Sequence, residues 1–348
     1  MKLTKLLCGV FAMLAAVCAA AAAQEYTSAD DVMATADAQD FTVQGEYSVP
    51  ELDQFFQVIA RGDGQFDLVG YKGALPGEGW DRSMARFFGT GVLNDGKLEI
   101  TGVKMDIPRK GDDAREVVFN DEQKAKCKLY FRFDGSKVFF GKNDKEYDAV
   151  KLLRKSPTLG EKAPEGAWVI YDGSNTDNFI GNAEVNEKTG DLFSELVVKP
   201  FENRPYRLHL EFMTSFMPRS EGQARANSGV YIDECYECQV LDSFGLEGRD
   251  NECGGFYQAT RPIVNMAFPP LTWQTYDIDF TPVKYDENGQ KIANARFTVY
   301  QNGYCIHDDI ELSEPTPGRY SEAETHHGLY LQGHGNRVQY RNIWVQYK

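Results

Sequence analysis

The feature that most constrains the fold is a long succession of short alternating segments separated by tight turns. Asp-Gly pairs at residues 63–64, 95–96 and 134–135 each stand between stretches in which apolar and polar residues alternate. This combination is typical of β-hairpins, because Asp and Gly tolerate the positive φ angles that a two-residue hairpin turn requires. No amphipathic helix of more than three turns is apparent, so the sequence predicts an all-β protein.

The same pattern continues beyond Trp168 to the C-terminus, where Gln301-Asn302-Gly303 predicts a further hairpin. Many strands at short spacing indicate a β-sandwich or jelly roll. The predicted strands cover residues 206–214, 229–241, 275–281, 295–301, 304–310, 328–333 and 338–347.

The chain of 348 residues is long enough for two domains. Residues 24–155 predict a smaller all-β meander, and residues 167–348 predict the larger sandwich. Between them, residues 156–166 read SPTLGEKAPEG, which is rich in Pro, Gly and charge and has no periodicity. This composition predicts an interdomain linker.

Residues 1–23 have the layout of a secretory signal peptide. Two lysines, an apolar run and small residues ending in three alanines precede Gln24. The apolar run is short for a membrane span, and Val17 stands before Cys18 where a lipoprotein signal would have a small residue. We therefore expect export to the periplasm or the extracellular space, without a lipid anchor or a membrane span.

The charge of the chain argues against nucleic acid as a partner. It has 52 acidic and 37 basic residues, a formal charge of -15. Removal of Lys2 and Lys5 with the signal would make this -17. A polyanion would be repelled by such a surface.

Five cysteines follow the predicted signal: Cys127, Cys235, Cys238, Cys253 and Cys305. Cys235 and Cys238 have the spacing of a zinc or redox motif, but a zinc site would need a second close pair. We expect a local disulfide from Cys235 or Cys238 to Cys253 instead, since an exported chain permits one.

Side-chain alternation predicts which residues face the core. Leu208, Leu210 and Phe212 share one face of their strand, and His209 and Glu211 share the other. In residues 229–241 the apolar face is opposite a polar face that carries Glu237 and Gln239. The same alternation predicts that Cys235 lies on this polar face. Polar side chains interleaved with aromatic ones suit sugar, although ordinary solvated surface is the expectation for a single position such as His209 or Glu211.

Several motifs in order resemble the 3-keto-disaccharide hydrolase family. They are ANSGVYI at 226–232, YECQVLDS at 236–243, WQTYD at 273–277, LQGHGNR at 331–337 and YRNIW at 340–344. The resemblance covers about residues 165–348 and implies a concanavalin A-like jelly roll of two antiparallel sheets. It also implies hydrolysis of glycosides whose C3 hydroxyl has already been oxidised to a ketone.

The implied chemistry needs a base, an acid and a group that stabilises negative charge. A C3 ketone acidifies the C2 proton, so a base can form an enolate, the glycosidic oxygen leaves from C1, and water adds back. Positions that match the family motifs supply the catalytic candidates Glu237, His334 and Arg341. The substrate-binding candidates are Gln239, Asp242, Asp277, Gln332, His307 and Arg337.

No cofactor is required by these motifs, although an enolate would gain from a divalent cation. Asp277, Asp279, Glu237 and His334 offer suitable ligand atoms, but their spacing does not specify a metal site. The expected partner is a glycan or keto-sugar, with functional coupling to the sugar oxidoreductase that makes the ketone.

Two other functions remain open. An ordinary glycoside hydrolase on this fold would carry two carboxylates, commonly as Glu-x-Asp-x-x-Glu on one strand, and that motif is absent. A noncatalytic carbohydrate-binding protein would need only the polar face, because the same fold also serves lectins.

Overall fold

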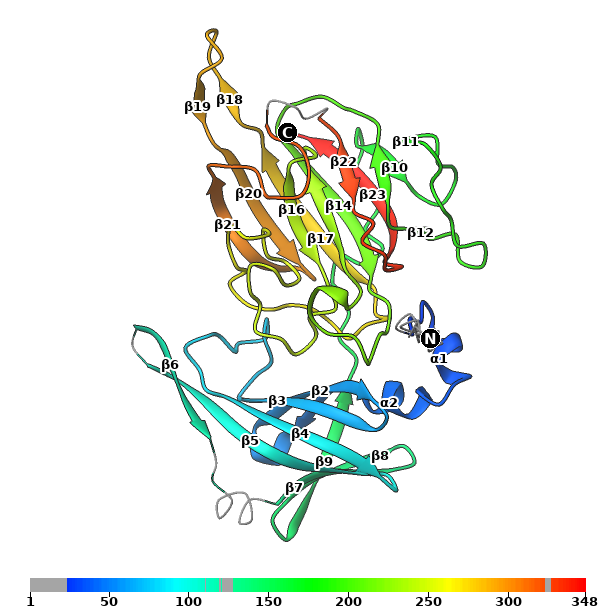
Figure 1. Cartoon of the computed structure of the whole chain (residues 1–348), viewed down its shortest axis with the longest axis vertical. Coiled ribbons are helices and arrows are strands. Elements are labelled where there is room, and N and C mark those ends of the chain that lie inside the picture. Colours follow the sequence, from blue (N-terminus) through cyan, green and yellow to red (C-terminus); the bar gives the residue numbers. More distant parts are fainter. Residues whose placement is uncertain (1–23, 110, 119, 121–127, 323–326) are drawn as a thin grey trace, which may run out of the picture.

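The computed structural model describes residues 24–109, 111–118, 120, 128–322 and 327–348. It consists of two β-domains, one above the other in Figure 1. The predicted signal peptide and Cys127 lie outside the described residues. None of the helices in the described part of the chain is long and apolar enough to cross a membrane.

The N-terminal domain is an antiparallel β-barrel. Strand β4 pairs with both β3 and β5, which closes the order β4-β3-β2-β1-β9-β8-β7-β5 into a ring, and β6 extends from β5. Two short helices, α1 (Ala29–Met33) and α2 (Ala38–Val43), precede it. The strands are β1 (Gly45–Val49), β2 (Gln54–Gly62), β3 (Gln65–Lys72), β4 (Arg86–Asn94), β5 (Lys97–Arg109), β6 (Gly111–Val118), β7 (Leu129–Asp134), β8 (Lys137–Lys142) and β9 (Lys145–Leu152).

The three predicted Asp-Gly hairpins are confirmed. Asp63 and Gly64 connect β2 and β3 with φ angles of 54° and 72°, and Asp95 and Gly96 connect β4 and β5 with φ angles of 47° and 75°. The third pair joins β7 to β8. Because positive φ at both central residues matches the twist of the flanking strands, the first two turns also set the register of their hairpins; in the third, Asp134 is the last residue of β7 and Gly135 alone of the pair has a positive φ, 59°.

The C-terminal domain is the predicted sandwich of two antiparallel sheets (Figure 1). The larger sheet has the order β10-β23-β14-β17-β20-β21, with β12 paired to β23; the smaller has the order β11-β13-β22-β15-β16. Its strands are β10 (Trp168–Tyr171), β11 (Phe179–Ile180), β12 (Leu192–Phe193), β13 (Leu196–Val198), β14 (Tyr206–Met213), β15 (Ser228–Ile232), β16 (Tyr236–Val240), β17 (Gln274–Thr281), β20 (Ala295–Gln301), β21 (Tyr304–Leu312), β22 (Leu329–Leu331) and β23 (Gln339–Tyr347), with a small β18 (Lys284–Tyr285) and β19 (Lys291–Ala293) ribbon at one end.

The prediction of one strand over residues 229–241 is wrong, because the segment is a hairpin. Asp233 and Glu234 adopt positive φ angles of 51° and 54°, so β15 turns back into β16. Residues directly opposite each other in the hairpin share a face, and Val230 opposes Cys238. The predicted apolar face therefore still lies in the core, but Cys235, at the turn, lies in the core as well and not on the polar face.

The expected disulfide is also wrong. Cys235, Cys238 and Cys253 are buried free thiols, and Cys305 is a free, half-buried thiol. The Sγ atom of Cys253 lies 3.2 Å from the Tyr276 hydroxyl, which satisfies it within the core.

The two domains are joined by an extensive set of contacts. Phe244 of the sandwich packs in one apolar cluster with Ile59, Val69 and Trp80 of the barrel. Arg219 forms a bidentate ion pair with Asp37, at 2.8 Å for both bonds. Because these contacts combine apolar burial with directional hydrogen bonds, they fix the barrel at one end of the sandwich.

Candidate functional site

The outward face of the smaller sheet carries the predicted carboxylate. Glu237 lies on β16 with its side chain away from the core, and its backbone nitrogen donates to Thr316 Oγ1 at 2.7 Å. Tyr231, on β15 directly opposite, donates its hydroxyl to Glu237 Oε2 at 2.9 Å. Because the segment around Thr316 and Pro317 covers both residues, Glu237 is only 3% exposed.

This burial perturbs the acidity of Glu237. Loss of hydration disfavours the charged form and raises the pKa of Glu237 to about 7, although the Tyr231 hydrogen bond acts in the opposite direction. A carboxyl that titrates near neutral pH can accept a proton in one step and return it in another. Glu237 therefore has the acidity of a general acid and base.

Amide side chains extend the polar face on either side of Glu237. The Gln239 amide lies between two acceptors: in one orientation its nitrogen donates to Gln223 Oε1 at 2.9 Å, and in the swapped orientation it donates instead to Glu237 Oε1 at 3.0 Å. Gln332 follows β22 and points Nε2 at the Tyr231 hydroxyl, 3.5 Å away. Its Oε1 is buried without a hydrogen-bond partner among the described residues. Such an acceptor is costly unless a ligand donor satisfies it.

A cation that the sequence analysis missed lies on the same face. The guanidinium of Arg319 stacks on Tyr330 at 3.9 Å from the ring centroid and pairs with Glu234 at 2.6 Å. The Tyr330 ring in turn lies 5.8 Å from that of Tyr231. Arg319 belongs to the connection between β21 and β22, where no periodicity in the sequence indicates the direction of a side chain.

The structure places His334 at the edge of this face. It is exposed, in the loop that follows Gln332, and the described residues give it no hydrogen bond or ion pair. Asn336 of the same loop accepts from the Asn227 nitrogen at 2.8 Å, and Asn227 Oδ1 lies 3.4 Å from Gln239. Glu237, Gln239 and Gln332 thus lie near one another around Tyr231, with His334 in the loop that follows Gln332.

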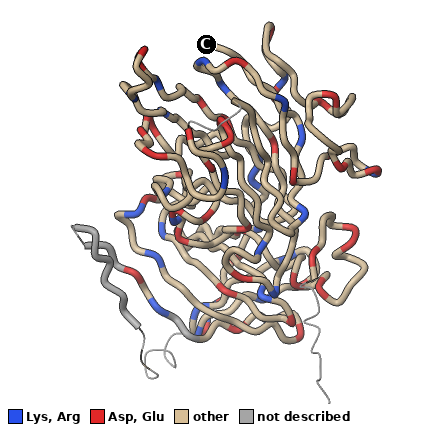
Figure 2. Tube along the Cα trace, turned by 45° about the horizontal axis from the view of Figure 1, so that its top comes forward, with Lys and Arg blue, Asp and Glu red and all other residues tan. Residues whose placement is uncertain are grey.

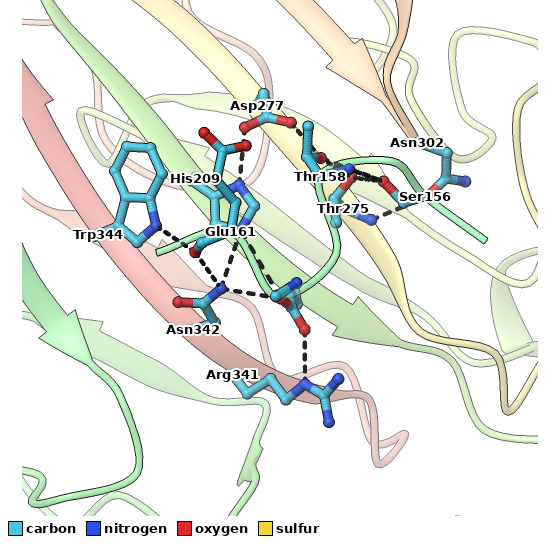
Figure 3. Close-up of polar contacts among 12 residues, drawn as sticks. Ser156, Thr158, Glu161, His209, Thr275, Asp277, Asn302, Arg341, Asn342 and Trp344 are labelled. Atoms are coloured by element: carbon cyan, nitrogen blue, oxygen red, sulfur yellow. Dashed lines mark hydrogen bonds and ion pairs between the residues drawn. The ribbon is translucent and has the colours of Figure 1, made fainter. Parts of the chain in front are cut away.

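Arg341 and Asp277 lie elsewhere, on the outward face of the larger sheet (Figure 3). Arg341 pairs with Glu211 at 2.7 Å, and Asp277 contacts His209 Nδ1 at 2.8 Å. Residues 236, 238, 276 and 278 fill the core between the two sheets, so this cluster and Glu237 are on opposite sides of the sandwich.

The segment that was predicted to be a linker covers this second cluster. Thr158 donates to Asp277 Oδ2 at 2.8 Å, and the Gly160 nitrogen donates to Glu211 Oε1 at 2.6 Å (Figure 3). Consequently His209 and Glu211 are 0% and 1% exposed, and the expectation that they are solvated surface is wrong. Their direction was predicted correctly; the covering segment could not be seen in the alternation pattern.

The other three candidates make structural contacts. Asp242 is buried in an ion pair with Arg225 at 2.6 Å, beyond the end of β16. His307 Nε2 lies 2.7 Å from the Gly254 carbonyl oxygen, and burial lowers the pKa of His307 to about 4. Arg337 is on the surface, paired with Glu184 at 2.6 Å. The structure brings none of the three to Glu237.

The four suggested cation ligands do not converge, because Asp277 and Glu237 lie on opposite sides of the sandwich. Among the described residues, the grouping of ligand atoms within 4.8 Å of one another is Glu161, His209 and Asp277. His209 and Asp277 already hydrogen-bond each other, and Thr158 occupies the second oxygen of Asp277. The residues present therefore do not fit a catalytic cation at Glu237.

The site thus consists of a buried carboxyl with a raised pKa, beside tyrosines and amides, on one sheet of a β-sandwich. The chain belongs to the family described as the 3-keto-alpha-glucoside-1,2-lyase-like domain, which matches residues 155–346. That range includes both sheets of the sandwich and leaves the barrel outside the family.

Solved structures similar to this chain include two candidate glycosyl hydrolases from Parabacteroides distasonis ATCC 8503. The first is 25% identical, with a TM-score of 0.47, and the match covers 54% of this chain and 86% of that one. The second is 14% identical, with a TM-score of 0.37, covering 52% and 94%. No curated protein matches the chain.

Proposed function

We propose that the protein cleaves the glycosidic bond of 3-keto-glycosides and that Glu237 is the base. The observation that carries the proposal is the raised pKa of Glu237, about 7, on a sheet face that belongs to the matched family domain. A carboxyl with an ordinary pKa near 4.5 would be a poor base for a carbon acid at neutral pH.

The proposed reaction begins with transfer of the C2 proton to Glu237. The electron pair left at C2 forms an enolate with the C3 oxygen, and its return expels the glycosidic oxygen from C1, which takes up a proton. Water then adds across the C1–C2 double bond, with hydroxyl at C1 and hydrogen at C2. Glu237 exchanges this proton with the solvent and can then supply the hydrogen that C2 takes up in the last step, because its pKa lies close to neutral pH.

The surrounding residues have distinct roles in this proposal. Tyr231 holds Glu237 by its hydroxyl, and the unsatisfied Oε1 of Gln332 accepts from a sugar hydroxyl. Arg319 takes the place that Arg341 had in the sequence-based hypothesis, because its guanidinium is on the same face and attracts negative charge on the C3 oxygen. His334 protonates the leaving oxygen from the exposed loop.

Two expectations about context remain part of the proposal. The signal-like residues 1–23 support export to the periplasm or outside the cell. The ketone must be made before this protein can act, so a sugar oxidoreductase supplies the substrate.

The proposal is tested with residues 24–348 and a pair of nitrophenyl glucosides, one oxidised at C3 and one not. We expect release from the keto-glucoside alone, and a loss of about a thousandfold in Glu237→Gln, in line with the contribution of a general base. The matched control is Glu287→Gln, which removes an exposed carboxylate of the same domain. Equal cleavage of both glucosides, or sugar binding without cleavage of either, would overturn the proposal.

A further inference from the structure

A cleft of about 700 Å³ lies between the two domains, outside the site described above. One wall is the outward face of β2 to β5 of the barrel, and the other is made of residues 221–225 and 242–252 of the sandwich. A volume in this range is typical of pockets that enclose small organic ligands. The barrel thus contributes a surface to a cavity that the family domain alone would lack.

The cleft is held open by rigid contacts on both sides. The buried Arg225 side chain pairs with Asp242 and lies 3.4 Å from the Ala60 carbonyl oxygen of β2. Gly245 packs so closely on the barrel that a Cβ atom there would lie 2.4 Å from Ile59 Cδ1. These contacts link the two walls of the cleft directly to each other.

The cleft has the chemistry of a site for a neutral polyhydroxyl ligand. Five basic and six acidic side chains line it, and most of them form ion pairs within one wall, for example Arg61 with Asp67 of the barrel at 2.6 Å. Figure 2 shows basic and acidic residues interspersed along the strands of the barrel. Paired charges cancel each other, so the cleft offers hydrogen-bonding groups but little net electrostatic field. Such a lining disfavours anionic ligands and suits the hydroxyl groups of a sugar.

An aromatic ring completes this chemistry. Phe88 of β4 lines the cleft half-buried, with Arg86 and Lys104 each 5.1 Å from its ring centroid. Aromatic faces pack on the C–H surfaces of sugar rings, while the charged groups around them take the hydroxyls.

The cleft continues the polar face of Glu237. Gln239 contacts Gln223, and the preceding residues Glu221 and Gly222 line the cleft. Asp242, also at the cleft, is five residues beyond Glu237. At about 3.3 Å per extended residue, the cleft begins on the order of 15 Å from the carboxyl, farther than one sugar ring spans.

We propose that the interdomain cleft is a binding subsite for the remote, neutral sugar units of an oligosaccharide whose reacting unit lies at Glu237. This inference rests on the proposed function for the identity of the reacting unit. It makes the substrate a glycan longer than a disaccharide and gives the barrel the role of holding it.

Calorimetric titration of residues 24–348 tests the inference without catalysis. The probes are maltohexaose, cellohexaose, xylohexaose and mannohexaose, each beside its disaccharide. We expect at least one hexasaccharide to bind about tenfold or more tightly than its disaccharide, and Phe88→Ala to remove about tenfold of that affinity. Phe139→Ala is the matched control, because Phe139 is a half-buried barrel residue under Arg132 that does not line the cleft.

A second variant separates blockage of the cleft from misfolding. Thr90 is exposed on the cleft wall and Thr101 is its direct cross-strand partner outside the lining, so Thr90→Trp should abolish the hexasaccharide preference and Thr101→Trp should keep it. The inference is overturned if no hexasaccharide binds more tightly than its disaccharide, or if Thr90→Trp binds as the wild type does. These outcomes leave the keto-glucoside assay unaffected, so the two proposals fail separately.

Discussion

At the scale of single residues, the chemistry depends on Glu237 and its partner Tyr231. The alternation of side chains in the sequence predicted that Glu237 and Gln239 face away from the core, and they do. It did not predict that residues 316–318 bury Glu237, or that Arg319 stacks on Tyr330 of the same sheet, since both follow from the path of an irregular connection. Arg341 was misplaced because its motif identifies a strand but not which sheet that strand joins.

The pH dependence of the reaction tests the role of Glu237. As a base, Glu237 must be deprotonated, so the acid limb of the kcat/KM profile on the keto-glucoside should rise with pH, with a midpoint at a pH of about 7. The Tyr231 hydrogen bond favours the charged carboxylate, so Tyr231→Phe should raise the pKa of Glu237 and move the rising limb to higher pH. A limb that stays at the same pH in Tyr231→Phe would contradict this coupling.

At the scale of secondary-structure elements, the sequence predicted the Asp-Gly turns. It did not predict the contacts by which a segment distant in sequence covers the face of a sheet. Asp-Gly pairs predict hairpins because the backbone angles they tolerate are local. The turn at Asp233 and Glu234 was missed because neither residue is a glycine, and the strand parity on both sides still suggested one continuous strand. Residues 156–161 have the composition of a linker, yet they hydrogen-bond to side chains of β14 and β17 that are more than fifty positions away in sequence.

Removal of one hydroxyl tests whether this segment stabilises the fold. Thr158→Val keeps the shape of the side chain but deletes the bond to Asp277, so we expect the free energy of unfolding to fall by about 1.5 kcal/mol, as for a hydrogen bond to a charged group. Thr101→Val, at an exposed strand position, should change it by less than about 0.5 kcal/mol. Urea unfolding measures the free energy of unfolding of both variants. Equal stability of the two would show that the hydrogen bond from Thr158 to Asp277 does not stabilise the fold.

At the scale of the whole molecule, the barrel and the sandwich behave as one unit. The sequence has a separate run of alternating segments for each, and each has its own main apolar cluster. What it could not show is the third apolar cluster, which combines Phe244 with barrel residues, and the cleft beside it. A surface formed by residues of both domains produces no periodic pattern in the sequence of either domain.

Truncation of Phe244 tests this coupling. Phe244 is 1% exposed, so Phe244→Ala should destabilise the protein by about 3 kcal/mol through lost burial and the cavity that remains. Because the cluster spans both domains, hydrogen exchange should accelerate in barrel strand β3 as well as in the sandwich. Acceleration confined to the sandwich would mean that the domains unfold independently.

The central claim, that Glu237 removes the C2 proton of a 3-keto-glycoside, is tested most directly in heavy water. If cleavage proceeds through the enolate, the released keto-sugar from the wild type must carry deuterium at C2, detectable by mass spectrometry and NMR, and Glu237→Gln must slow product release and deuterium incorporation together, by about a thousandfold. Release of a keto-sugar that keeps its original hydrogen at C2 would contradict the account.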